Sequence, residues 1–227
     1  MSECWHGLEK TGNMLMKKIN LLLVSLVCLT LSSSAFGAKP KESQMPSLCA
    51  KEYQKVTTDE EICRALDELK GSVGEYSRDA ILGNNLSEKP IKIEFKELSS
   101  IKPQYASYDA LGMKKGKQLY IYVNMKHHSA PPEALAALLS HEALHQDEYN
   151  SVNEETYAWT MEANVWADMC RRNPNLRNDK ISSLANRENI LLKMLENANY
   201  SNILIRNTVV NHPGYQKLPQ KSPGFDN

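Results

Sequence analysis

The sequence predicts an α+β fold in which a small antiparallel or mixed sheet precedes a helical C-terminal part. Three observations support this prediction. Residues 90–98 alternate apolar and charged side chains, a pattern typical of a half-exposed strand. Two further strand-like runs, 108–113 and 118–124, flank a short turn around Gly116. From residue 131 onward, the apolar residues follow helical spacing instead.

The N-terminal part resembles a bacterial signal peptide over residues 16–37. A basic start at Lys17 and Lys18 precedes the apolar run 19–31, and Ala35-Phe36-Gly37 fits the small-x-small cleavage rule. The apolar run is shorter than the roughly 20 residues that a membrane-spanning helix needs, so a retained anchor is the less favoured alternative. We therefore expect a periplasmic or secreted protein whose mature chain is not inserted in a membrane.

The other segments follow from composition. Residues 1–15 would be an upstream leader, unless translation begins at an internal methionine. We expect a polar lead-in over 38–57, a single domain with its own core over 58–215, and a flexible tail rich in Lys, Pro and Gly over 216–227. The 27 basic residues balance the 27 acidic ones and no basic run occurs, so no nucleic-acid partner is expected.

Three cysteines follow the signal-like segment: Cys49, Cys63 and Cys170. In an oxidising compartment two of them should pair. A Cys49–Cys63 bond closes the shorter loop, and a Cys63–Cys170 bond is the alternative. None has the CxxC spacing of a metal site, so we expect none to bind a metal.

The first predicted helix runs from Thr58 to about Lys70. Thr58 and Glu61 have the spacing of a capping box, and Gly71 suits the helix end. Its inward side chains are expected to be Ile62, Leu66 and Leu69.

The next predicted helix carries a metal-binding pattern. Two prolines and Glu133 suit a helix start, and a mostly apolar run over 134–139 leads into His141-Glu142-Ala143-Leu144-His145. Histidines four residues apart share one helix face and can bind one cation, while Glu142 points to the flank, where it can act as a general base. Two histidines on a surface helix are the alternative, which does not explain polar groups at only one place of an apolar helix.

A third ligand is expected on the helix that follows. Ser151 and Glu154 fit a capping box, which gives Glu154 a structural role and leaves Glu155 for the metal. Glu155 shares a helix face with Glu162, and Ala158 leaves space for another helix to approach. Glu155 is therefore the expected third ligand, with Glu154 as its competitor.

With Glu155-Thr-Tyr-Ala158 after the HExxH pattern, residues 118–170 resemble the zincin metallopeptidases of the gluzincin type. The resemblance implies a zincin-like fold, Zn²⁺ held by His141, His145 and Glu155, Glu142 as general base, and a peptide or protein substrate. It also implies an edge strand that binds the extended substrate, for which 118–124 is a candidate.

Further residues have candidate roles near such a metal. Asp147 or Asn150 could orient a ligand histidine, or could cap a loop. A donor to the reacting carbonyl oxygen could come from any of several residues that packing or loop formation would also explain: Tyr157, His212, Tyr215, His127 and His128.

The C-terminal part is expected to hold one more helix, an amphipathic one with inward apolar residues between Ile181 and Leu195. Taken together, these patterns predict a zinc-dependent hydrolase of peptide bonds outside the cytoplasm. Two alternatives stay open: a non-catalytic metal-binding or scaffold protein of the cell envelope, and an amidase that acts on a non-protein amide.

Overall fold

The computed structural model describes residues 49–146, 149–178 and 182–226. The expected leader and signal peptide, most of the expected lead-in and Asp147 lie outside these ranges. The described part holds six α-helices and three strands, which confirms the α+β class. The strands are β1 (Lys92–Lys96), β2 (Ala110–Lys115) and β3 (Gln118–Asn124), and the helices are α1 (Glu60–Leu69), α2 (Glu75–Leu82), α3 (Pro132–Glu142), α4 (Val152–Arg172), α5 (Ser183–Asn197) and α6 (Ile203–Asn211).

The three strands form a mixed sheet in the order β1-β3-β2. β1 runs parallel to β3, and β2 pairs with β3 in an antiparallel hairpin whose turn has Gly116 in the left-handed region, at φ 60°. The hypothesis that 118–124 is an edge strand is therefore wrong. The tight turn places β2 along one side of β3, and β1 pairs along the other side, so β3 is central and β1 and β2 are the two edge strands.

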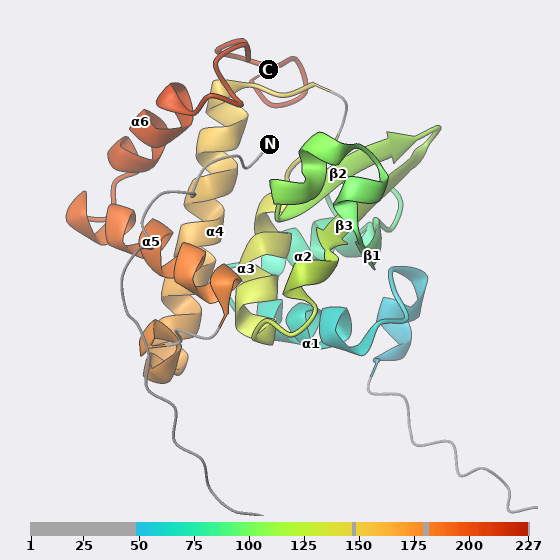
Figure 1. Cartoon of the computed structure of the whole chain (residues 1–227). Coiled ribbons are helices and arrows are strands. Elements are labelled where there is room, and N and C mark those ends of the chain that lie inside the picture. The colour runs from blue at the N-terminus through green and yellow to red at the C-terminus, as the bar shows by residue number, and fades with distance from the viewer. Residues whose placement is uncertain (1–48, 147–148, 179–181, 227) are drawn as a thin grey trace, which may run out of the picture. The chain divides into compact units, whose positions relative to one another are not determined.

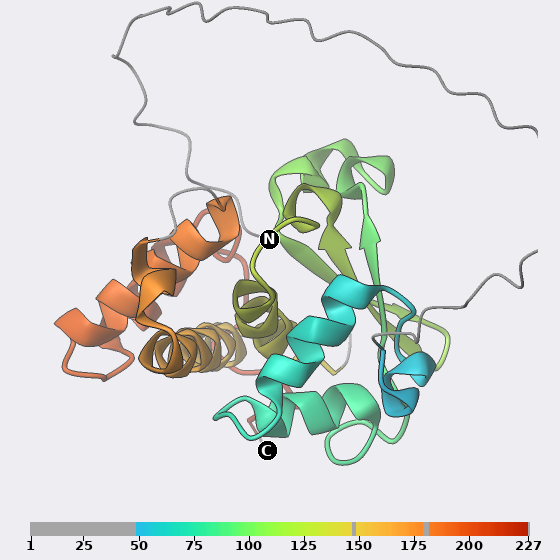
Figure 2. The ribbon, with the colours of Figure 1, turned by 90° about the horizontal axis from the view of Figure 1, so that it is seen from below.

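Helix α3 lies at the centre of the helical part. It packs against α4 on one side and against α1 and α2 on the other, and it also contacts β2 (Figures 1 and 2). Eight of its eleven residues are apolar or small, and these precede His141. The side chains from Ala134 to Glu142 are all buried. An almost completely buried helix is what an apolar run with one polar site predicts.

Two of the helices, α1 and α2, differ from the expectation. Asp59, not Thr58, caps α1, because its carboxylate accepts hydrogen bonds from the backbone N–H groups of Glu61 and Ile62. Helix α2 was not predicted. It has eight residues, begins after Gly74 and ends at Gly83, which adopts φ 78°. So short a segment carries little periodic signal of its own.

The cysteines in the described ranges have one pairing. Cys49 and Cys63 form a disulfide, the shorter of the two expected loops, and Cys170 is a buried free cysteine. Burial raises the pKa of the Cys170 thiol to about 11, which makes it a poor nucleophile. In the same ranges, no helix has both the length and the apolar character that crossing a bilayer requires.

The C-terminal segment is attached to the start of α4 rather than free, in contrast to the flexible tail expected over 216–227. The backbone N–H groups of Val152 and Asn153 donate to the carbonyl oxygens of Pro219 and Gln220. Ser222 is only 3% exposed. Residues 216–226 therefore form part of the folded unit and contribute to the region around the two histidines.

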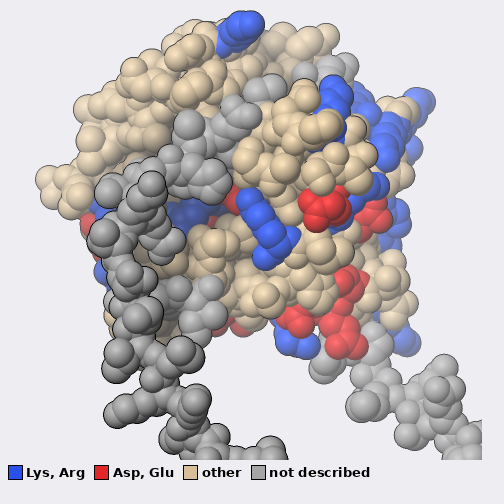
Figure 3. Space-filling model, in the orientation of Figure 1, with Lys and Arg blue, Asp and Glu red and all other residues tan. Residues whose placement is uncertain are grey.

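Lysine and arginine side chains gather at the hairpin end of the sheet on the face shown in Figure 3. The exposed lysines of this turn are Lys114, Lys115 and Lys117. Lys115 is tied to the sheet, because its Nζ donates to the hydroxyl of Tyr122 at 2.6 Å. Acidic side chains lie close by on the same face, so the surface there is of mixed charge.

Candidate metal centre

The two histidines come together at the C-terminal end of α3. The helix ends at Glu142, and the next turn is tightened, because the N–H groups of Leu144 and His145 donate to carbonyl oxygens three residues back rather than four. His145 therefore lies just beyond the helix, not inside it as the spacing predicted. Its imidazole still meets that of His141, with the two Nε2 atoms 3.3 Å apart.

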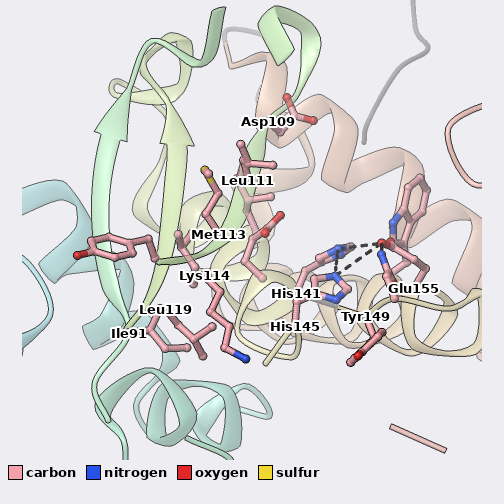
Figure 4. A pocket seen from close by; sticks show the side chains of 18 of the residues that line it. Ile91, Asp109, Leu111, Met113, Lys114, Leu119, His141, His145, Tyr149 and Glu155 are labelled. Atoms are coloured by element: carbon pink, nitrogen blue, oxygen red, sulfur yellow. Dashed lines mark hydrogen bonds and ion pairs between the residues drawn. The ribbon is translucent and has the colours of Figure 1, made fainter. Parts of the chain in front are cut away.

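Glu155, on the first turn of α4, completes the group (Figure 4). Its Oε2 lies 3.8 Å from Nε2 of His141, and its Oε1 lies 3.8 Å from Nε2 of His145. Two imidazole nitrogens and one carboxylate thus approach a common point, with all ligand atoms within 4.8 Å of one another. This buried His141, His145 and Glu155 group can hold a metal ion.

The donor atoms fit a bound cation in two respects. Nitrogen ligands about 2.0–2.1 Å from a tetrahedral metal lie roughly 3.3 Å from each other, which matches the separation of the imidazoles. Oε2 of Glu155 is buried without a hydrogen-bond partner among the described residues. Although burial opposes ionisation, the nearby charges of His145 and His141 lower the pKa of Glu155, so this carboxylate is an anionic donor.

Each histidine is held by a second carboxylate through its other ring nitrogen. Nδ1 of His141 lies 3.1 Å from Oε2 of Glu162, and Nδ1 of His145 lies 2.9 Å from Oε1 of Glu154. A carboxylate at this position accepts the Nδ1–H bond and leaves the Nε2 lone pair free for a metal. Both imidazoles are therefore oriented with Nδ1 on a carboxylate and Nε2 toward the common point, as a metal site needs.

This arrangement separates the roles of the two neighbouring glutamates. Glu155 lies on the side of the Nε2 atoms, and Glu154 lies behind His145. The expected capping box forms only in part. The hydroxyl of Ser151 accepts from the N–H of Glu154 at 3.1 Å, but the Glu154 carboxylate turns to His145 and to Ser222, whose hydroxyl donates to it at 2.8 Å.

A buried ionic network continues behind His141. Both oxygens of Glu162 accept hydrogen bonds from the guanidinium of Arg187, at 2.6 and 3.0 Å. Nε of Arg187 lies 3.3 Å from Asp109, which in turn lies 2.7 Å from Nε2 of His127. Burial alone would raise the pKa of Glu162, yet the charge of Arg187 and the contact with His141 lower it to about 2.

The surroundings of His145 are also acidic. Burial alone would lower its pKa, but the hydrogen bond to Glu154 and the charges of Glu155 and Glu142 raise the pKa of His145 to about 9. Without a metal, the imidazole of His145 is therefore in its positively charged form near neutral pH. A divalent cation would replace that positive charge at the same place.

Glu142 lines the same cleft as the three donors. The cleft has a volume of about 380 Å³ and is bounded on one side by the edge strand β2. A Cβ atom built on Gly112 of β2 would lie 3.6 Å from Oε2 of Glu142, so strand and carboxylate are neighbours. Apolar side chains of the cleft include those of Ile91, Leu111, Met113 and Leu119, which are labelled in Figure 4, and those of Ile121 and Leu138.

Among the candidate hydrogen-bond donors to the reacting carbonyl oxygen, Tyr215 is one that lines the cleft, as Glu155 does. Burial, and then the negative charge of Glu155, raise the pKa of Tyr215 well above its usual value, so its hydroxyl keeps its proton. His212 lies behind this ring, with the centroids 4.7 Å apart.

The other candidates lie elsewhere. Tyr157 is 45% exposed and its ring packs on Phe225, while His127 contacts Asp109. His128 lies beside Asp59, outside the lining of the cleft. Asn150 donates to Glu155 rather than to a histidine.

Sequence reasoning missed the roles of Glu162, Arg187 and Ser222. One signal for Glu162 was present, because it follows Glu155 by seven residues on the same face of α4.

Comparison of the chain with protein-family models, with curated proteins and with solved structures found no match. The functional argument therefore depends on the geometry of the site.

Proposed function

We propose that this protein is a zinc-dependent hydrolase that cleaves peptide bonds outside the cytoplasm. One observation carries the proposal. Nε2 of His141, Nε2 of His145 and the Glu155 carboxylate converge, both Nδ1 atoms are held by further carboxylates, and Glu142 lines the same cleft. The HExxH spacing of the sequence and its resemblance to gluzincins support the same reading.

The donor set favours zinc. Two imidazoles and one carboxylate are a common ligand set for catalytic Zn²⁺, and three protein ligands leave one coordination position open. When bound, such an ion lowers the pKa of a water to about 7 and polarises a carbonyl group. The carboxylates behind both histidines support the proposal, because structural decoration of a surface helix does not need them.

Glu142 would move the proton in the reaction. The oxygen of a water molecule adds to the carbonyl carbon of the scissile bond while Glu142 accepts the proton that the water loses. As the carbon–nitrogen bond breaks, Glu142 returns that proton to the leaving nitrogen. The carboxylate is only 9% exposed and lies beside β2, so it is largely shielded from bulk water.

Tyr215 would stabilise the developing negative charge. Its protonated hydroxyl can donate a hydrogen bond to the carbonyl oxygen as that oxygen becomes anionic, and loss of such a donor typically costs about two to three powers of ten in rate. Tyr215 is 4% exposed and rests on His212 and Trp159, which favours one fixed ring position.

A peptide substrate suits the edge strand. β2 pairs with β3 on one side, and the strand order leaves its other side without a neighbouring strand among the described residues. An extended chain can add to such an edge through backbone hydrogen bonds. The Cys49–Cys63 disulfide supports a location in an oxidising compartment.

Two substitutions test the proposal. The purified protein should contain about one zinc per chain and cleave members of a peptide library, and His145→Ala should abolish the bound zinc. Glu142→Gln should keep the zinc but lower turnover by about 10²- to 10⁴-fold, because only the base is lost. Glu133→Gln, at the other end of α3, is the matched control and should change neither.

The outcomes separate the alternatives. Unchanged turnover in Glu142→Gln would remove the proposed base. Zinc without any cleavage of peptides or amides would favour the non-catalytic envelope protein, and cleavage of cell-wall amides alone would favour the amidase.

A further inference from the structure

We propose that Arg187 is a positioning residue that ties the ligand His141 to the edge strand of the cleft. Its guanidinium contacts three carboxylates: that of Glu188, its neighbour on α5, at 2.9 Å, and those of Glu162 and Asp109, which belong to other parts of the fold. The inference rests on the metal-binding half of the proposed function and is independent of the reaction that the site performs.

The first contact reaches the metal ligand. Arg187 lies on α5 and donates from two nitrogens to both oxygens of Glu162 on α4. Oε2 of that carboxylate also accepts from Nδ1 of His141 on α3. Glu162 is fully buried, so no solvent would hold its carboxylate in place if the guanidinium were missing. Arg187 thereby fixes the orientation of the His141 ring through Glu162.

The second contact reaches the cleft wall. Asp109 directly precedes β2, and its Oδ2 lies 3.3 Å from Nε of Arg187. The carbonyl oxygen of Asp109 also accepts from the N–H of Asn124 at the end of β3. Three residues further along β2 is Gly112, the neighbour of Glu142. One guanidinium therefore sets the position of both the ligand and the strand that borders it.

The shape of the side chain matters as well as its charge. A guanidinium offers a planar fork of donors, which can bind Glu162 with two bonds and still present Nε to Asp109. The guanidinium of Arg187 also lies over the ring of Trp159, with Cζ 5.8 Å from the ring centroid. This contact helps to hold the guanidinium in place. A lysine ammonium would keep the charge but could not make these three directed contacts.

Substitution of Arg187 by lysine tests the inference, because it retains the buried positive charge. Arg177→Lys is the matched control, since Arg177 pairs with Glu196 at 2.7 Å on the surface. Circular dichroism would first show that both variants are folded. Each would then be titrated with Co²⁺, and the visible spectrum of the bound ion would be recorded. We expect Arg187→Lys to bind Co²⁺ about 10- to 100-fold more weakly and with shifted bands, and Arg177→Lys to match the wild type.

A double-mutant cycle shows whether Arg187 acts through Glu162. Glu162→Gln and Arg187→Met should each weaken Co²⁺ binding, and the double variant, in which the Glu162–Arg187 contact is already lost, should be no weaker than Glu162→Gln alone within about twofold. Additive losses would mean that Arg187 acts by another route and would overturn the inference.

Wild-type affinity and spectrum in Arg187→Lys would also overturn it, while the proposed function would stand. Conversely, a wild-type protein that binds Co²⁺ but cleaves no peptide would refute the proposed reaction and leave the role of Arg187 intact.

Discussion

The two histidines of the candidate metal centre make the same kind of contact but are held by different parts of the molecule. His141 lies within α3 and is backed by Glu162, which is fully buried and bound by Arg187 from α5. His145 follows the helix end and is backed by Glu154, whose other oxygen accepts from Ser222 in the C-terminal segment. The first support comes from a buried cation, and the second comes from a neutral hydroxyl group.

This difference shows that two similar His–carboxylate pairs need not have similar energetic roles. A buried carboxylate with a guanidinium partner is costly to disrupt, because the remaining charge stays in a poorly solvated place. Removal of a hydroxyl takes away only one neutral donor, and the Glu154 carboxylate keeps its contact with His145. We therefore expect changes behind His141 to affect folding and metal binding together, and changes behind His145 to affect mainly metal binding.

The largest effect is expected for Glu162→Gln. It removes one of the carboxylates that Arg187 faces and weakens the acceptor for Nδ1 of His141, so stability should fall by roughly 3 kcal/mol and zinc affinity by about 10- to 100-fold. Urea unfolding and zinc titration against a chelator would measure the two losses. Glu196→Gln, which breaks the surface pair with Arg177, is the control and should cost less than about 1 kcal/mol.

If Glu162→Gln were no more destabilising than Glu196→Gln, the buried network would not support the fold. The proposed difference between the two sides of the site would then disappear.

A smaller effect is expected for Glu154→Gln on the other side. The glutamine oxygen can still accept from Nδ1 of His145, so we expect stability to change by only about 1 kcal/mol. Zinc affinity should still fall by roughly 10-fold, because a neutral amide makes the imidazole a weaker donor to the metal. The same titration measures it, with Glu61→Gln on α1 as the control for loss of one carboxylate.

A stability loss as large as that of Glu162→Gln would show that Glu154 also belongs to an ionic core. The proposed energetic difference between the carboxylates behind His141 and His145 would then be wrong.

The extent to which the sequence predicted this site follows from the range of each interaction. The His141, His145 and Glu155 group could be predicted because four-residue spacing and helix register are local properties. The pairing of Glu162 with Arg187 joins residues 25 apart on two helices, and only the packing of α4 against α5 brings them together.

Two other features depend in the same way on tertiary structure. The composition of the segment after Gln216 predicts a mobile tail, yet its carbonyl oxygens accept from the first N–H groups of α4, which lack partners within that helix. The strand order was not predicted either. Both 108–113 and 118–124 are predicted as strands, and the parallel pairing of β1 decides which of them becomes the central strand.

The smallest effect, and the sharpest test of the comparison, is expected for Ser222→Ala. The substitution removes one hydrogen bond to Oε2 of Glu154 and leaves the contact with His145 in place. Zinc affinity should fall by a few-fold and stability by about 1 kcal/mol, since Ser222 is buried and loses a single neutral donor. Ser201→Ala, at an exposed position, should change neither quantity. A loss of zinc as severe as that of Glu162→Gln would mean that the C-terminal segment holds His145 as firmly as the ionic network holds His141.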